Sequence, residues 1–513
     1  MKHVSTMRRF GIGAVIVLAG VLLGLAPSSV HAAGTVGDGT PASCTEAAFD
    51  AALTGGGLVT FDCGPAAHTI VLTYYKQIGD DTEIQGADKI TLSGANTTPH
   101  FQVYSGKSLT LRDITLARGN GTFGSIQNFG TLRIIHSQVN LSNASDSGGA
   151  IENYGVVTLE DSTVGENEAA NRGGGIFNDT GAVTVSGSRI ISNTAQSETG
   201  GGIWSSGTLT VSNSTLAGNA AASGGGGGVF NAGSLSLTDS SLADNRASFA
   251  GPASGGGLNH ASGIAYLSGV TFDGNTSNTY GGGLFIQGGN LSASEMLFTH
   301  NTAVVGAAVS NSGTFTLTDS LVYSNTADGA AIIANGMAGS GATNIVTAIN
   351  VTVSGNVSSS ANGSVVESDY GVMKLIFATI VDNVGYGVGR GPSSSTLRLK
   401  DTIVAGNSPM NCPSGITSDG FNIASDNSCV LTQVSDRSGT DPALGPLADN
   451  GGRTETYLPQ TGSPAIDGGQ CVTGVDTDQR GEARPYGAAC DVGAVEVGAP
   501  AQTKSFLPSL FGG

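Results

Sequence analysis

The sequence predicts an all-β fold, a single-stranded right-handed parallel β-helix with about 25 residues per coil. Three observations predict it. A short block that ends in Asn repeats along most of the chain, apolar residues alternate with small polar ones inside each block, and Gly supplies 81 of the 513 residues without the triplet period of collagen. A period of two is typical of strands, and apolar stretches of about three to five residues are too short for helices.

One copy of the repeat, at residues 200–219, reads GGGIWSSGTLTVSNSTLAGN. Three such apolar stretches per copy, separated by Gly, Asn, Asp and Ser, predict three short strands and three turns per coil. One unit cannot bury its apolar side alone, but stacked units can when each strand pairs in parallel with its counterpart about 4.8 Å away. A leucine-rich repeat would need a denser Leu pattern, and a propeller blade would need about 40–45 residues.

The clearest marker of the repeat is an Asn that recurs every 24 to 31 residues, with an apolar residue three positions before it from Asn167 onward. The predicted ladder consists of Asn167, Asn193, Asn219, Asn245, Asn275, Asn301 and Asn325, and the column extends to Asn143 on one side and to Asn356, Asn383 and Asn407 on the other. Asn tolerates a left-handed backbone at tight turns, and stacked amides can hydrogen-bond between coils. We therefore interpret the column as structural.

A second, partial column consists of Asp113, Asp161, Asp239, Asp319 and Asp401, each just before the third strand of its copy. A side-chain hydrogen bond that closes the turn explains an Asp at such a position. Calcium binding is the alternative interpretation, and no other cofactor is predicted. The net charge of −18 argues against nucleic acid or an anionic membrane surface as a partner.

The ends of the chain differ from the repeats. Residues 1–32 have a basic start, an apolar run and small residues that resemble an A-x-A cleavage site. Together these features predict a bacterial export signal and a secreted or cell-surface location. Residues 33–124 are expected to form an N-terminal cap and the first irregular coils, residues 125–408 the regular coils, and residues 409–497 a module that closes the C-terminal end. Residues 498–513 form a linker and an apolar tail too short to span a bilayer, so no transmembrane span is expected in the mature chain.

The cysteines agree with export. They fall into three local pairs with separations of 19, 17 and 19 residues, and these pairs are Cys44 and Cys63, Cys412 and Cys429, and Cys471 and Cys490. The spacing favours three local disulfides, which form in oxidising compartments. No CxxC spacing supports zinc.

A catalytic set is not evident in the sequence. A glycoside hydrolase needs two carboxylates about 5–9.5 Å apart, which neighbouring coils could supply. The outward strand positions are mostly Ser and Thr, and no basic residue recurs beside a carboxylate pair in register. The charged residues of the C-terminal module, Asp478, Arg480 and Asp491 with Arg484 and Glu496, are interpreted as structural ion pairs that fix the module on the last coils.

Several short motifs resemble known families. The repeats resemble the pectin-lyase-like β-helix superfamily, and the motifs GGAI at 148–151, FDGN at 272–275 and FTHN at 298–301 resemble those of polymorphic outer-membrane proteins. The C-terminal module looks like the choice-of-anchor Q module of bacterial surface proteins through DPALGPLADNGGRTETYLPQTGSPAIDGG at 441–469, TDQRGEARP at 477–485 and CDVGAVE at 490–496. These resemblances imply a secreted or surface-displayed protein.

The leading hypothesis is a non-enzymatic surface protein whose Ser/Thr-rich sheet faces serve adhesion or carbohydrate contact. Its expected partners are surface glycans or components of the cell envelope. The alternative is a polysaccharide lyase or glycoside hydrolase on a pectin-lyase-like scaffold, and a third hypothesis is a passive spacer whose length alone matters.

Overall fold

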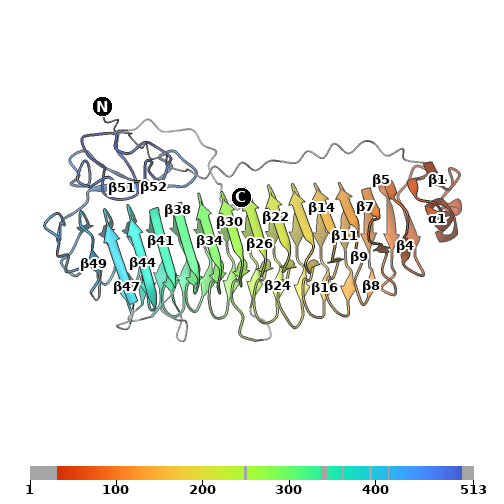
Figure 1. The fold of residues 1–513 in the computed structure, drawn as a ribbon, viewed down its shortest axis with the longest axis horizontal. Coiled ribbons are helices and arrows are strands. Elements are labelled where there is room, and N and C mark those ends of the chain that lie inside the picture. Colours follow the sequence, from red (N-terminus) through yellow and green to blue (C-terminus); the bar gives the residue numbers. More distant parts are fainter. Residues whose placement is uncertain are drawn as a thin grey trace, which may run out of the picture.

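The computed structural model describes residues 32–247, 251–336, 344–360, 363–391, 395–413 and 415–498. These residues form an elongated parallel β-solenoid of about 14 turns, with coils of about 26 residues, as the repeat predicts. A smaller module lies against one flank of the rod (Figure 1). The predicted export signal, apart from Ala32, and the predicted tail beyond Gly498 fall outside the described residues.

Each regular coil contains four strands where the sequence predicted three. In one coil these are β21 (Ile203–Ser205), β22 (Thr208–Ser212), β23 (Thr215–Ala217) and β24 (Ala220–Ala221). Strands equivalent to β22 and β23 both belong to a broad sheet, those equivalent to β21 form a second sheet of three-residue strands, and those equivalent to β24 form a third sheet of two-residue strands. The extra strand was missed because two residues are too few to show alternation.

The three-residue sheet carries one strand per coil, and its neighbours pair in parallel and in register. Its strands are β4 (Lys76–Ile78), β6 (Phe101–Val103), β9 (Ile126–Asn128), β13 (Ile151–Asn153), β17 (Ile176–Asn178), β21, β25 (Val229–Asn231), β29 (Leu258–His260), β33 (Leu284–Ile286), β37 (Val309–Asn311), β40 (Ile333–Asn335), β43 (Ser364–Ser368) and β46 (Tyr386–Arg390).

The broad sheet bends at one residue per coil, and the predicted Asp column occupies that bend. All five of its members have a left-handed backbone, with φ between 44° and 52°. The carboxylates reach other coils or the flanking module: Asn350 donates to Asp319, and Arg453 donates to Asp239. Asp therefore suits the bend because it tolerates positive φ. Hydrogen bonds to another coil or to the flanking module take the place of the predicted turn-closing hydrogen bond.

The core of the solenoid is a continuous apolar column. Val164, Ile190 and Leu216, which stand three residues before ladder Asn residues, are fully buried and belong to one cluster that extends from the first coils to the last. Phe272 and Phe298, at the same position two coils further on, stack with ring centroids 5.0 Å apart. The predicted apolar anchors therefore form the interior.

The N-terminal end is covered by one helix and one strand. Helix α1 (Glu46–Leu53) begins at Thr45, whose side chain accepts a hydrogen bond from the Ala48 N–H, and its Phe49 is fully buried. Strand β1 (Ala32–Val36) pairs with β2 (Gly57–Phe61), and the predicted disulfide Cys44–Cys63 closes the segment.

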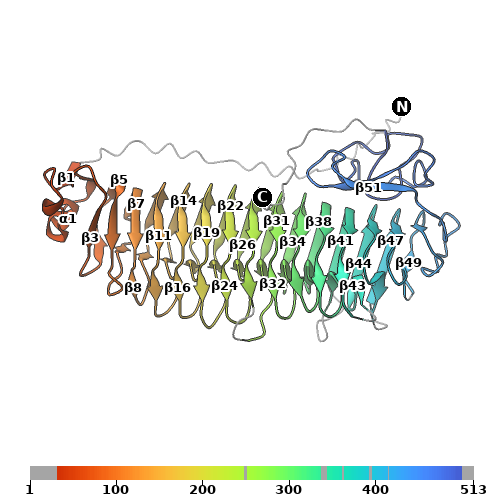
Figure 2. The same ribbon diagram turned by 180° about the vertical axis from the view of Figure 1, so that it is seen from behind.

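The C-terminal region forms two parts. The chain from about residue 408 to 440, with the disulfide Cys412–Cys429, continues the stack beyond the last full coil. Residues 441–497 then turn back and lie along the flank, beside the coils from β38 (Thr314–Tyr323) to β47 (Ser395–Lys400), as Figures 1 and 2 show. We call residues 441–497 the flanking module.

The flanking module contains one hairpin of β51 (Leu444–Ala448) and β52 (Thr456–Pro459), and the disulfide Cys471–Cys490 closes its last loop. All three predicted disulfides are thus confirmed. Within the described ranges, no helix has both the length and the apolar character needed to cross a bilayer.

Candidate functional site

The predicted Asn residues form a continuous buried ladder. In a typical step, Nδ2 of Asn193 donates to Oδ1 of Asn219 and to the carbonyl oxygen of Val164, both at 3.0 Å, and the backbone N–H of Asn193 donates to the same Oδ1. The same pattern links Asn167, Asn193, Asn219, Asn245, Asn275, Asn301, Asn325, Asn356, Asn383 and Asn407. The ladder satisfies the backbone at one corner of every coil and is inaccessible to a ligand.

Two details of the predicted column differ from the structure. The positive φ angles fall on the residue before the ladder position, such as Ser192 at 54°, and not on the ladder Asn residues themselves. Asn143 is not in the column, because it pairs with Glu168. Ser142 occupies the ladder position in this coil, and its N–H donates to Oδ1 of Asn167. The residue three positions before Ser142 is the buried Val139, so the rule of an apolar residue at that spacing holds here too.

Two further ladders were not predicted. Asn128, Asn153 and Asn178, each the last residue of its three-residue strand, pass hydrogen bonds of 2.7 and 2.8 Å along the axis. A buried Ser column at the bend of the broad sheet does the same, and its members are Ser137, Ser162, Ser188, Ser214 and Ser240. Each hydroxyl accepts from the backbone N–H one coil earlier, which belongs to Ile114 for Ser137 and to the preceding Ser for the others. The recurring Ile-x-Asn triplets after the Gly clusters were the available signal for the first of these.

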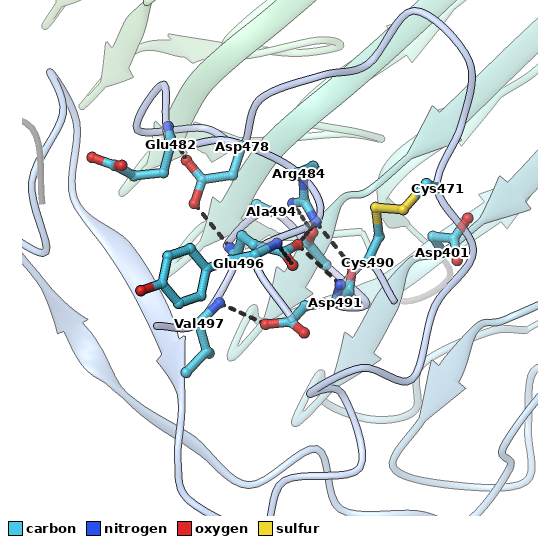
Figure 3. A network of polar contacts seen from close by, with 12 residues as sticks. Asp401, Cys471, Asp478, Glu482, Arg484, Cys490, Asp491, Ala494, Glu496 and Val497 are labelled. Atoms are coloured by element: carbon cyan, nitrogen blue, oxygen red, sulfur yellow. Dashed lines mark hydrogen bonds and ion pairs between the residues drawn. A yellow bond between two sulfur atoms is a disulfide. The ribbon is translucent and has the colours of Figure 1, made fainter. Parts of the chain in front are cut away.

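The charged residues of the flanking module form a buried network (Figure 3). Nε and Nη2 of Arg480 donate to Oδ2 of Asp478 at 3.0 and 2.8 Å, and Nη1 of Arg484 donates to Oε2 of Glu496 at 3.0 Å. The carboxylate of Asp491 accepts backbone N–H groups, including that of Val497 at 2.6 Å.

This network is buried throughout. The side chains of Arg484 and Glu496 are both 0% exposed, and burial lowers the pKa of Arg484. Burial also raises the pKa of Asp491 to about 6 and that of Asp401, on the adjoining coil, to about 6. Because no substrate reaches these groups, their arrangement serves to hold the module together.

An open candidate site lies on the outer face of the broad sheet. It is a shallow groove of about 330 Å³ lined by Thr238, Tyr266, Leu267, Ser268, Ser292, Ala293, Ser294, Thr316 and Thr318. We call it the Tyr266 groove. The Tyr266 side chain is 59% exposed, and register places it between Ser236 and Ser292 of the neighbouring coils. An exposed aromatic ring thus projects from a surface of Ser and Thr hydroxyl groups.

The flanking module reaches the edge of this groove through Arg453. Nη2 of Arg453 lies 2.6 Å from Oδ1 of Asp239, and Nε lies 3.7 Å from Oε2 of Glu295. These two carboxylates belong to coils on either side of Gly269, where a Cβ atom would lie only 2.6 Å from Nη2 of Arg453. Gly269 therefore leaves room for the guanidinium, and three successive coils are fixed at this edge.

One carboxylate pair was also missed by the sequence analysis. Glu367, on β43, and Asp369 lie near enough for the charge of Asp369 to act on Glu367, and Oε2 of Glu367 is buried without a hydrogen-bond partner. Burial, and secondly the charge of Asp369, raise the pKa of Glu367 to about 7. In the part of the chain that the structure describes, no group of three His, Cys, Asp or Glu residues is arranged to hold a metal ion.

Comparison with known proteins assigns no relative to this chain: no protein family matches it, and no curated protein matches it. Any functional assignment must therefore come from the surfaces described above.

Proposed function

We propose that this chain is a secreted or surface-displayed, non-catalytic solenoid that contacts carbohydrate through the Tyr266 groove. One observation carries the proposal: a largely exposed aromatic ring projects from a flat surface of Ser and Thr hydroxyls in register. Aromatic rings offer a large apolar surface at low conformational cost, and hydroxyls can both donate and accept hydrogen bonds. A sugar ring has matching features, since it carries apolar C–H groups on its faces and hydroxyl groups around its rim.

The rest of the chain supports a surface location. Three disulfides are weakly consistent with an extracellular protein, and the N-terminal sequence pattern is that of an export signal. We further place the solenoid with right-handed β-helices of the pectin-lyase-like type, and residues 441–497 with the choice-of-anchor Q modules, on the strength of the sequence motifs. Surface glycans or cell-envelope components are the proposed partners.

A glycan array probed with the mature protein tests the groove. We expect binding to a subset of neutral polysaccharides, and a loss of about tenfold or more in affinity for Tyr266→Ala, because the contact surface of the ring is removed. Tyr266→Phe should retain most of the affinity. Tyr154→Ala, which removes an exposed ring on another sheet, is the matched control and should bind these neutral glycans normally. Unchanged binding by Tyr266→Ala would contradict the proposal.

The alternative function, a polysaccharide lyase or glycoside hydrolase, is favoured only by the Glu367–Asp369 pair, in which a carboxyl with a pKa of about 7 could act as a general acid. Incubation with polygalacturonate, alginate and neutral polymers, with and without Ca²⁺, tests it. Product formation that disappears in Glu367→Gln, but not in Tyr266→Ala, would favour the enzyme over the binding protein.

A further inference from the structure

A second surface combines aromatic rings with carboxylates beside the three-residue sheet, which is a different sheet from the one that carries the Tyr266 groove. Phe129 and Tyr154 directly follow β9 and β13, so they occupy the same corner of two successive coils. Their rings stack with centroids 5.2 Å apart and an interplanar angle of 7°, and both side chains are more than one-third exposed. We call these rings, with Asp146, Glu152 and Asp179, the acidic aromatic face.

One carboxylate contacts the Tyr154 hydroxyl, and two more lie near enough for their charges to act on it. The hydroxyl donates to Oε1 of Glu152 at 2.9 Å. Burial, then the hydrogen bond and charge of Glu152, and then the charges of Asp179 and Asp146 raise the pKa of Tyr154. Negative charge is therefore concentrated beside an exposed ring.

These carboxylates have neutral hydrogen-bond partners. Glu152 also accepts from Gln127 at 2.7 Å, Asp146 accepts from Asn171 at 2.8 Å, and Asp179 accepts from Ser206 at 2.9 Å. Among the described residues, no ion pair involves Asp146, Glu152 or Asp179. The hydrogen bonds fix the positions of the carboxylates and leave their charge without a cation.

The same strip of rings holds a cation two coils further along. Trp204 continues the aromatic strip through Phe177, with centroids 4.7 Å apart. The guanidinium of Arg172 lies 5.3 Å from the Trp204 ring centroid and forms an ion pair with Glu198. At that position a ring and a carboxylate bind a cation from the chain itself, which is the combination that cation–π contacts favour. Tyr154 has a comparable ring with carboxylates nearby, but no described residue places a cation there as Arg172 does at Trp204.

We propose that the acidic aromatic face binds a polysaccharide that carries protonated amino groups, such as a polymer of glucosamine with free amines. Asp146 is exposed and Asp179 is half-buried, so the ammonium groups would lie against these two carboxylates, and the sugar rings against Phe129 and Tyr154. Glu152 is only 7% exposed and both of its oxygens accept hydrogen bonds, so it would act through its charge alone. Charge complementarity supports this choice, because the chain carries a net charge of −18 and would repel polyuronates. The face is separate from the Tyr266 groove, so either site can exist without the other.

Isothermal titration with glucosamine oligomers of one length, in free-amine and N-acetylated forms, tests the proposal at a mildly acidic pH. We expect the free-amine oligomer to bind about tenfold more tightly, and the difference to shrink with added salt because exposed charges are screened. Equal binding of the two oligomers, or binding that is independent of salt, would overturn the proposal. Equally tight binding of a Lys-rich peptide at this face would overturn the assignment to a polysaccharide.

Two variants locate the site. Asp179→Asn preserves the size of the side chain and the acceptor for Ser206, and it should weaken binding of the free-amine oligomer by about fivefold, since one carboxylate charge is lost. Phe129→Ala combined with Tyr154→Ala should weaken it further. Tyr266→Ala should bind the free-amine oligomer normally, which separates this site from the groove. Circular dichroism and thermal unfolding check that each variant is folded, and wild-type affinity in folded Asp179→Asn and in the folded double variant would refute the site.

Discussion

The regular coils and the flanking module bury polar groups in different ways. In the coils, the long buried polar ladders are neutral and consist of Asn amides or Ser hydroxyls that repeat from coil to coil. In the flanking module, the buried groups are full charges, as in the pairs Arg480–Asp478 and Arg484–Glu496. A repeat places identical side chains about 4.8 Å apart, where like charges would repel, whereas an irregular segment can place opposite charges together. A buried position that repeats in every coil therefore favours a neutral side chain that can both donate and accept hydrogen bonds.

The largest expected effect concerns the buried charges of the flanking module. Arg484→Met should lower the free energy of unfolding of the module by about 3–5 kcal/mol, because Glu496 is left buried without its partner. Denaturant unfolding with limited proteolysis of residues 441–497 measures the loss. Arg484→Met combined with Glu496→Gln should recover part of it.

An exposed ion pair supplies the control for that prediction. Arg398→Ala, which removes a partner of Asp419 on the surface, should cost less than about 1 kcal/mol. Equal losses for Arg484→Met and Arg398→Ala would contradict the view that the module depends on its buried charges.

A smaller effect is expected in the neutral ladder. Asn219→Ala removes the acceptor of the Asn193 N–H and the donor to the Ile190 carbonyl, so we expect a loss of about 1–3 kcal/mol. Asn143→Ala, one residue outside the ladder, should change stability by less than about 0.5 kcal/mol. Thermal unfolding of the two variants measures the difference, and similar losses would mean that the ladder bonds contribute little.

The smallest effect is a dependence of stability on pH that arises from buried carboxyl groups in the last coils and the flanking module. Burial raises the pKa of Asp401 and of Asp491 to about 6, above 3.8 for an exposed Asp. The folded chain therefore binds more protons than the unfolded chain between these values, and stability should increase by of order 1 kcal/mol as the pH falls from about 7 to about 4.5. Stability is lost again as the pH rises through about 6.

Denaturant titrations across this pH range measure the dependence. Asp401→Asn should flatten the profile in part, because it removes one of the three carboxyl groups whose pKa is raised to about 6 or 7, the others being Asp491 and Glu367. Asp88→Asn, at an exposed position in the irregular middle of β5 (Thr82–Ser93) near the N-terminus, is the matched control and should leave the profile unchanged. A profile that Asp401→Asn does not alter would show that Asp401 has little influence on stability.

The sequence predicted those parts of the structure that repeat. Alternation around Val164 and Ile190 identified the core, because a strand with one buried face shows it directly. The Cys spacing identified the three disulfides because each pair is local. A shift of one residue placed Asn143 in the ladder, since Ser142 performs the same role with a different side chain.

The surfaces were harder to predict, because they depend on contacts between residues far apart in the chain. Asn350 donates to the carbonyl of Thr477, 127 residues away, and bonds of this kind place the module on the flank and not over the end. The Tyr266 groove and the acidic aromatic face each combine residues from several coils, so no short continuous stretch of sequence contains either of them. Only the strand register brings Phe129 beside Tyr154.

The bond between Arg453 and Asp239 bears on how such a chain can evolve in length. Within the described residues, the hydrogen bonds of the flanking module reach no further toward the N-terminus than Asp239. A duplicated or deleted repeat between Asp239 and Asp401 would separate the module from its partners by a full coil. Gene rearrangements that lengthen or shorten the rod should therefore be tolerated in the coils before Asp239 and selected against after it.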